Sequence, residues 1–316
     1  MMTPIYQTLK SSVKAGLQKG WDGYVWMLKI IVPISFLTFL IDTGGFIHWI
    51  DFVLTPVMGL LGLPPSAVIP LLLGLLTGIY GTLGALAAMS FSVPHMTLIA
   101  VFTLIAHNLI QEGIVQGKSG LKPIAATLTR LLAAIIMVVL LARLLGIEGV
   151  TSADGPAGPA AAQPFLFLLK KWTVDTIWLC VKIFFIIMAL MVILKILKDF
   201  HLAERIAGAL RPLLALLGLN ERVGLIWLTA CLFGLSYGAA VIVEEAREGN
   251  FTPDELVRLH LSIGINHSMI DDPILFMAFA INPFWLWIPR LAAAVVAVRV
   301  YRLIKGFKGS RIPGDK

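Results

Sequence analysis

Charged residues are scarce in this sequence, and their scarcity limits what the protein can be. Only 14% of the 316 residues are Asp, Glu, Lys or Arg, whereas 58% are hydrophobic, and the mean hydropathy is +0.90. Soluble globular proteins carry about 25% charged residues, so this composition excludes a soluble domain. The sequence instead predicts an all-α protein that crosses a membrane several times.

Cysteine is almost absent as well. Cys180 and Cys231 lie in apolar surroundings and lack the Cys-x-x-Cys spacing of zinc and redox sites. We interpret them as buried thiols without a disulfide. The sequence has no nucleotide-binding glycine loop, nucleophile elbow or metalloprotease helix, so it indicates no enzyme. It has no basic-plus-aromatic nucleic-acid motif either, and the net charge of +7 indicates anionic lipid head groups as partners.

Two stretches interrupt long apolar runs with amide, imidazole, hydroxyl and carboxylate side chains. Polar groups at membrane depth are costly in lipid, so they usually line a bundle interior or a solute pathway. We therefore predict that both stretches form the binding site for a substrate or ion. The predicted site residues are His107, Asn108, Gln111 and Glu112 in the first stretch, and Asn266, His267, Ser268, Asp271 and Asp272 in the second.

The two stretches belong to an internal duplication. The pairs that recur are Leu-Gly-Leu at 61–63 and 217–219, Tyr-Gly at 80–81 and 237–238, His at 107 and 267, and Arg-Leu at 130–131 and 290–291. The same order at a nearly constant offset predicts two repeats. We assign a basic cytoplasmic segment to residues 1–22, the first repeat to 23–147, an external linker rich in Pro, Gly and Ala to 148–163, the second repeat to 164–306, and a basic cytoplasmic tail to 307–316.

Each repeat is expected to hold about three spans, an interfacial amphipathic helix and a re-entrant helical hairpin. Residues 46–61 and 200–217 separate polar from apolar side chains at a helical period, which indicates helices lying flat on the membrane. Irregular backbone at membrane depth is tolerated where protein or water covers it, which favours short helices joined by a glycine turn. A straight helix with packing glycines is the alternative. The predicted hairpin tips are Gly78, Tyr80 and Gly81, and Ser236, Tyr237 and Gly238.

The Lys and Arg positions indicate how the repeats are oriented. An odd number of spans per repeat inverts the second repeat relative to the first. With the N-terminus in the cytoplasm, this inverted model places every basic cluster on the cytoplasmic face except Lys170 and Lys171. Counting the hairpins as full spans would instead place the basic tail outside. We therefore predict that both termini are cytoplasmic.

This arrangement resembles the Gate, or nucleoside-recognition, family. That family includes the cores of concentrative nucleoside transporters, the membrane part of the bacterial ferrous-iron transporter, and the spore maturation membrane proteins. The resemblance spans Tyr24 to Tyr301, and its motifs are residues 78–81 with 106–108 and residues 234–238 with 266–268. It implies a bacterial cytoplasmic (inner) membrane protein whose solute lies between hairpin tips and unwound helices. The histidine in each polar stretch and the Asp271–Asp272 pair depart from the nucleoside transporters.

The residues leave the bound species open. His107, Glu112, His267 and Asp271 form a nitrogen and oxygen set suited to a first-row divalent metal, and the same groups suit a nucleoside-like solute. Asp271 follows His267 by four residues and shares its helical face, whereas Asp272 is turned about 100° away. Adjacent buried carboxylates favour holding a proton, so a coupling proton or sodium ion is also expected as a cofactor.

The predicted function is a secondary transporter with a midplane site for a small polar solute or a divalent cation. A non-transporting scaffold or assembly factor of the spore-maturation type is the alternative. In that case the two polar stretches are satisfied buried networks that hold breaks in two helices. Whether the chain forms a homo-oligomer stays open.

Overall fold

The computed structural model describes residues 4–45, 51–118, 120–147, 163–200, 202, 211–219, 221–233, 242–245, 248 and 251–309, and all regular structure among them is helical. The predicted all-α class is thus confirmed. The half of the chain that holds the predicted first repeat contains α1 (Pro4–Thr43), α2 (Asp51–Leu60), η2 (Pro65–Ala67), α3 (Val68–Thr77), α4 (Ile79–Ala88), α5 (Val93–Ala106), α6 (Leu109–Lys118) and α7 (Pro123–Leu144). The half that holds the predicted second repeat contains α8 (Phe165–Asp199), α10 (Arg211–Leu216), α11 (Glu221–Phe233), α13 (Pro253–Asn266), α14 (Asp271–Phe276), η3 (Met277–Phe279) and α15 (Pro283–Gly309).

Several helical segments are long and apolar enough to cross a membrane. In the described part of the chain there are five, namely Ile5–Thr43, Val93–Lys118, Pro123–Leu144, Phe165–Asp199 and Pro283–Lys305. Residues 52–60 and 65–77 pass the same test only together, and they are bent by 80° against each other. These segments confirm a polytopic membrane protein, whereas three spans per repeat stays a prediction.

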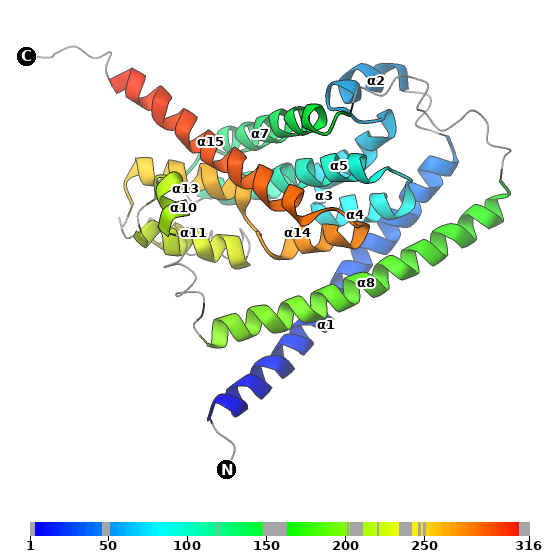
Figure 1. Cartoon of the computed structure of the whole chain (residues 1–316), viewed down its shortest axis with the longest axis horizontal. Helices are drawn as coiled ribbons and strands as arrows, with labels where there is room; N and C mark the ends of the chain where they lie inside the picture. Colours follow the sequence, from blue (N-terminus) through cyan, green and yellow to red (C-terminus); the bar gives the residue numbers. More distant parts are fainter. Residues whose placement is uncertain are drawn as a thin grey trace, which may run out of the picture.

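The two longest helices, α1 and α8, pack along one side of the molecule (Figure 1). Small residues on α1 allow the close approach, because a Cβ atom on Gly16 would lie 2.6 Å from the Cα atom of Val192 and one on Gly20 would lie 2.9 Å from the sulfur of Met188. These pairs also show that the helices run antiparallel. Small residues four apart are a common way for membrane helices to bring their backbones together.

The first predicted hairpin is two short helices on either side of Gly78. This glycine has φ +86°, in the region that only glycine adopts without strain, so it ends α3 and starts α4. The two helices fold back on each other, and the Thr82 hydroxyl of α4 donates a 2.9 Å hydrogen bond to the carbonyl of Pro70 in α3. The break agrees with two short helices rather than one straight helix. Its position within a membrane stays a prediction.

Some predicted features lie outside the described residues. They are the second hairpin tip with Ser236, Tyr237 and Gly238, the start of the first amphipathic helix at residues 46–50, most of the second amphipathic helix, and residues 148–162 of the linker.

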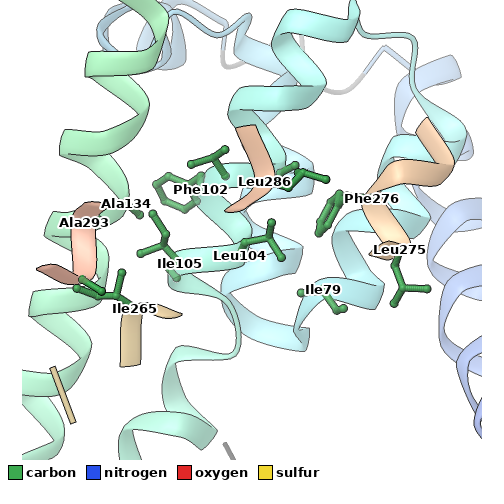
Figure 2. Packing of buried hydrophobic residues seen from close by; sticks show 14 of the residues in the cluster. Ile79, Phe102, Leu104, Ile105, Ala134, Ile265, Leu275, Phe276, Leu286 and Ala293 are labelled. Carbon is green, nitrogen blue, oxygen red and sulfur yellow. The ribbon is translucent and has the colours of Figure 1, made fainter. Parts of the chain in front are cut away.

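Helix α5 lies at the centre of the core. Its residues from Thr97 to Ala106 are all buried, which is the pattern of a helix surrounded by protein on every side. In Figure 2, Leu104 and Ile105 of α5 lie among side chains of the second repeat, including Ile265 of α13 and Leu286 of α15. One continuous core therefore joins the two predicted repeats, and it continues up to the end of α5, where the predicted site begins.

Candidate functional site

The two polar stretches lie where two helices end in the same way. Helix α5 ends at His107 with φ −85° and ψ 159°, and α13 ends at His267 with φ −85° and ψ 172°. The next residues, Asn108 and Ser268, have φ values of +50° and +47°. Non-glycine residues rarely adopt this left-handed conformation, so its occurrence at both positions indicates that the surrounding structure requires the break.

Each break is held by a buried arginine from a later helix. Arg130 of α7 donates through Nη2 to the carbonyl of His107 at 2.8 Å, and Arg290 of α15 donates through Nη2 to the carbonyl of His267 at 2.6 Å. Both side chains are fully buried. A cation here satisfies carbonyls that the helix end leaves free and interacts favourably with the negative end of the helix dipole.

The two imidazole rings and one carboxylate meet between the helix ends. The Nε2 atoms of His107 and His267 lie 3.3 Å apart. The Oε1 atom of Glu112 lies 3.1 Å from the first and 3.2 Å from the second. All three side chains are buried, and their three atoms form a nearly equilateral triangle. The structure therefore brings together residues that the sequence separates by 160 positions.

The other ring nitrogen of each histidine points back into its own helix. Nδ1 of His107 lies 2.9 Å from the carbonyl oxygen of Thr103, and Nδ1 of His267 lies 2.9 Å from that of Ile263. A carbonyl oxygen only accepts hydrogen bonds, so each Nδ1 must carry the hydrogen and donate it. In a neutral ring this places the hydrogen on Nδ1 and leaves the Nε2 lone pair directed at the shared centre.

Asp271 and Asp272 do not lie where their spacing from His267 predicts. The expectation that Asp271 shares a helical face with His267 assumes a continuous helix, and the chain is unwound between Asn266 and Asp271. Asp272 is the closer carboxylate, with Oδ2 3.7 Å from Nε2 of His107. Of the four predicted metal ligands the structure therefore gathers His107, Glu112 and His267, and places Asp271 outside that group.

A cavity of about 420 Å³ leads to this cluster. It is bounded by Trp26 of α1 and by Tyr80 at the hairpin tip, whose rings pack edge to face 5.2 Å apart. The predicted site residues that line it are Gly78, Tyr80, His107, Asn108, Gln111, Glu112, His267, Ser268, Asp271 and Asp272. Among the predicted site residues that the structure describes, two do not line the cavity: Asn266 is fully buried, and Gly81 packs inside the hairpin against Thr77 and Leu73.

Three residues of the site were not predicted from the sequence. Arg130 and Arg290 served only as markers of the repeat, although an arginine within an apolar run of a predicted span is itself a signal of a buried partner. Trp26 was interpreted only as part of the aromatic belt at the membrane interface. Its contact with Tyr80 could not be found without the packing of α1 against α4.

Comparisons with known proteins give a family match for part of the chain and a similar membrane protein. Residues 24–148 match the family model described as Gate, nucleoside recognition. A protein of Bacillus subtilis (strain 168), described as the uncharacterized membrane protein YvoD, is 28% identical over 292 residues, which cover 91% of this chain and 93% of that protein. No solved structure matches the chain. The part of the chain that is similar to the Gate, or nucleoside-recognition, family is therefore residues 24–148, which hold the first hairpin and the first broken helix.

Proposed function

We propose that this protein is a secondary transporter that moves a small polar solute or a cation through the cavity between its two repeats. The observation that carries the proposal is that the cavity ends on buried histidine and carboxylate side chains from both repeats. Burying such groups in a membrane protein costs several kcal/mol unless they are paired, so they usually mark a solute or ion pathway.

We further propose that the repeats are inverted in the membrane. In support, the same contacts recur at the same offset: Ser92 and Thr252 cap α5 and α13 by accepting from the backbone N–H three residues later. Arg130 and Arg290 then bind equivalent carbonyls at the other ends of these helices. Transporters built from inverted repeats place their site at the repeat interface, where each repeat can open toward one face.

The location follows from the basic residues and the apolar helices. We propose a bacterial cytoplasmic membrane with both termini in the cytoplasm, where anionic lipids attract the basic ends of the chain. At 1.5 Å per residue, the 40 residues of α1 and the 35 of α8 extend over about 60 Å and about 50 Å. The hydrocarbon core is about 30 Å thick, so part of the α1–α8 pair extends beyond the membrane.

Transport through the cavity can be tested in proteoliposomes. Charge movement would be recorded on a solid-supported membrane with Mn²⁺, Fe²⁺, Zn²⁺, uridine and adenosine as probes. We expect at least one probe to give a signal that Glu112→Gln abolishes, because Glu112 contacts both histidines at the end of the cavity. His95→Ala, at the start of α5 and outside the cavity, is the matched control and should keep the signal.

Access from both faces provides a second measurement on the same preparation. In a variant without Cys180 and Cys231, Gln111→Cys places a thiol in the cavity. A transporter should let a charged thiol reagent reach it from either side of the membrane. Labelling from a single face, with no signal from any probe, would favour the non-transporting scaffold.

A further inference from the structure

With both histidines neutral and Glu112 ionised, the centre of the site consists of three hydrogen-bond acceptors. Each histidine donates its Nδ1 hydrogen to a backbone carbonyl, so the neutral rings present only Nε2 lone pairs to each other. The ionised carboxylate of Glu112 is also an acceptor. Three acceptors within 3.3 Å of one another repel each other unless a cation lies between them.

We propose that His107, His267 and Glu112 bind a divalent first-row transition metal. The three edges of the triangle measure 3.1, 3.2 and 3.3 Å. Nitrogen and oxygen ligands at about 2.1 Å from an ion lie about 3.0 Å apart in octahedral geometry and about 3.4 Å apart in tetrahedral geometry. The observed edges fall within this range, and two imidazoles select such a metal over magnesium or calcium, which prefer oxygen ligands.

The three ligand side chains are held in place by second contacts of the kind found in metal sites. Histidine ligands in metalloproteins usually donate their second ring N–H to a carbonyl or a carboxylate, and both histidines do so here. The second oxygen of Glu112 lies 2.6 Å from Nη1 of Arg130, which leaves Oε1 free to face the histidines. Asp272, with Oδ2 3.7 Å from Nε2 of His107, offers one more oxygen on the cavity side.

This inference deepens the proposed function by naming the substrate class, and it rests on that proposal only for the claim that the bound ion moves. A nucleoside fits the cavity less well at its end, because a triangle with edges of 3.3 Å or less holds a single ion and not a ring. The competing explanation is a proton on one histidine, which would donate to the other two atoms without any metal.

The test is binding of Co²⁺ to the purified full-length protein. We expect one Co²⁺ per chain, visible absorption from the bound ion, and two strongly shifted, exchangeable NMR signals from the Nδ1–H groups of His107 and His267. These signals need no variant, so the result does not depend on whether a mutant folds. His267→Ala and Glu112→Gln should each weaken Co²⁺ binding by about 100-fold or more, whereas His95→Ala should leave it unchanged.

The outcomes separate the metal site from transport. No Co²⁺ binding, or binding that both variants retain, overturns the metal site and leaves a protonated histidine as the explanation. If uridine nevertheless moves charge and Glu112→Gln abolishes it, the transporter survives with a different substrate. Co²⁺ bound at the two histidines with no charge movement for any probe supports the site and overturns transport.

Discussion

Arg130 binds both the carbonyl of His107 and the carboxylate of Glu112. Arg290, at the equivalent position, binds the carbonyl of His267, and no carboxylate of the described residues lies within 4 Å of it. Two guanidinium nitrogens of Arg290, Nε and Nη1, have no hydrogen-bond partner in that part of the chain. The backbone at both breaks is nevertheless almost identical.

The comparison separates the contacts that fix the backbone at each break from the positions of the carboxylates. The arginine, the histidine and the left-handed residue after it recur at both breaks, where each arginine and each histidine Nδ1 bonds to a backbone carbonyl. The carboxylates differ in position and partner, since Glu112 joins both histidines and Asp272 approaches only His107. The two breaks thus share their backbone geometry and their histidines and differ in their carboxylates, so the two arginines are the residues at which the difference is best tested.

The largest effect is expected from removing Arg130. Arg130→Met leaves the buried Glu112 carboxylate without its cation, and breaking a buried ion pair in this way costs about 3–5 kcal/mol. Arg290→Met removes one hydrogen bond from a charged donor and should cost about 1.5–3 kcal/mol. Unfolding in detergent, followed by tryptophan fluorescence, measures both.

A double variant provides the control for this difference. Glu112→Gln added to Arg130→Met removes the unpaired charge, so part of the lost free energy of unfolding should return. Equal losses in the two single variants, or no recovery in the double variant, would show that the repeats do not differ as the contacts indicate.

The two halves also differ in how closely a backbone carbonyl approaches the residue after each histidine. The carbonyl of Gly74 accepts from the N–H of Asn108 at 2.9 Å, and in the second repeat the carbonyl of Ala230 accepts from the N–H of Ser268 at 3.5 Å. Glycine in the first repeat therefore stands where the second repeat has alanine. A Cβ atom on Gly74 would lie 2.5 Å from the hydroxyl of Thr82, which leaves no room for it.

Gly74→Ala should therefore destabilise the protein. Overpacking costs about 1–3 kcal/mol, and the helix propensity of alanine returns at most about 1 kcal/mol. The matched control is Gly23→Ala in α1, where nothing lies within 4 Å of the added carbon, and it should stabilise the helix slightly. Thermal unfolding of both variants measures the difference; a stable Gly74→Ala would mean that α3 and α4 separate easily.

The sequence predicted the parts of the fold that follow from composition and local pattern. Apolar length identified the spanning helices, and Gly78 between two apolar stretches identified the break, because only glycine fits that turn without strain. The offset between His107 and His267 led to the prediction of a duplication, which stays a prediction, although the two histidines do end their helices in the same way. The packing of α1 along α8 was not predicted. The small residues Ser12, Gly16 and Gly20 indicate that another helix packs closely against α1, but they do not indicate which helix it is.

At the site, the sequence predicted the residue types better than their contacts. His107, Glu112 and His267 were in the predicted ligand set, and they do meet. The choice of Asp271 over Asp272 depended on a regular helix, and the unwound segment after Asn266 removed that basis. Arg290, which donates to the carbonyl of His267 at this break, lies on another helix, so no local pattern could have revealed the contact.

The smallest difference between the repeats lies at the start of their central helices. Asp254, outside the candidate spans, follows the cap of α13, and the equivalent position in α5 is Pro94. Its carboxylate accepts from Lys305 at 2.6 Å and from Tyr301 at 3.1 Å, and Arg258 lies 2.9 Å away. Asp254 thus joins this end of α13 to α15 through a charge network, and Pro94 at the equivalent position of α5 has no charged side chain to do so.

Because of this network, we expect Asp254 to make the free energy of unfolding depend slightly on pH. The hydrogen bond from Lys305 lowers the pKa of Asp254, against the opposing effect of burial and with help from Tyr301. A carboxylate with a lowered pKa stabilises the folded state above its ordinary pKa of about 3.9, and this contribution is lost as the pH falls through the folded value. Asp254→Asn should thus lower the free energy of unfolding by about 0.5 kcal/mol at pH 7, the usual worth of a partly exposed ion pair, and the deficit should disappear in acid. Melting curves of wild type and variant between pH 7 and pH 3 measure this; parallel curves at every pH would mean that the carboxylate acts only by its shape.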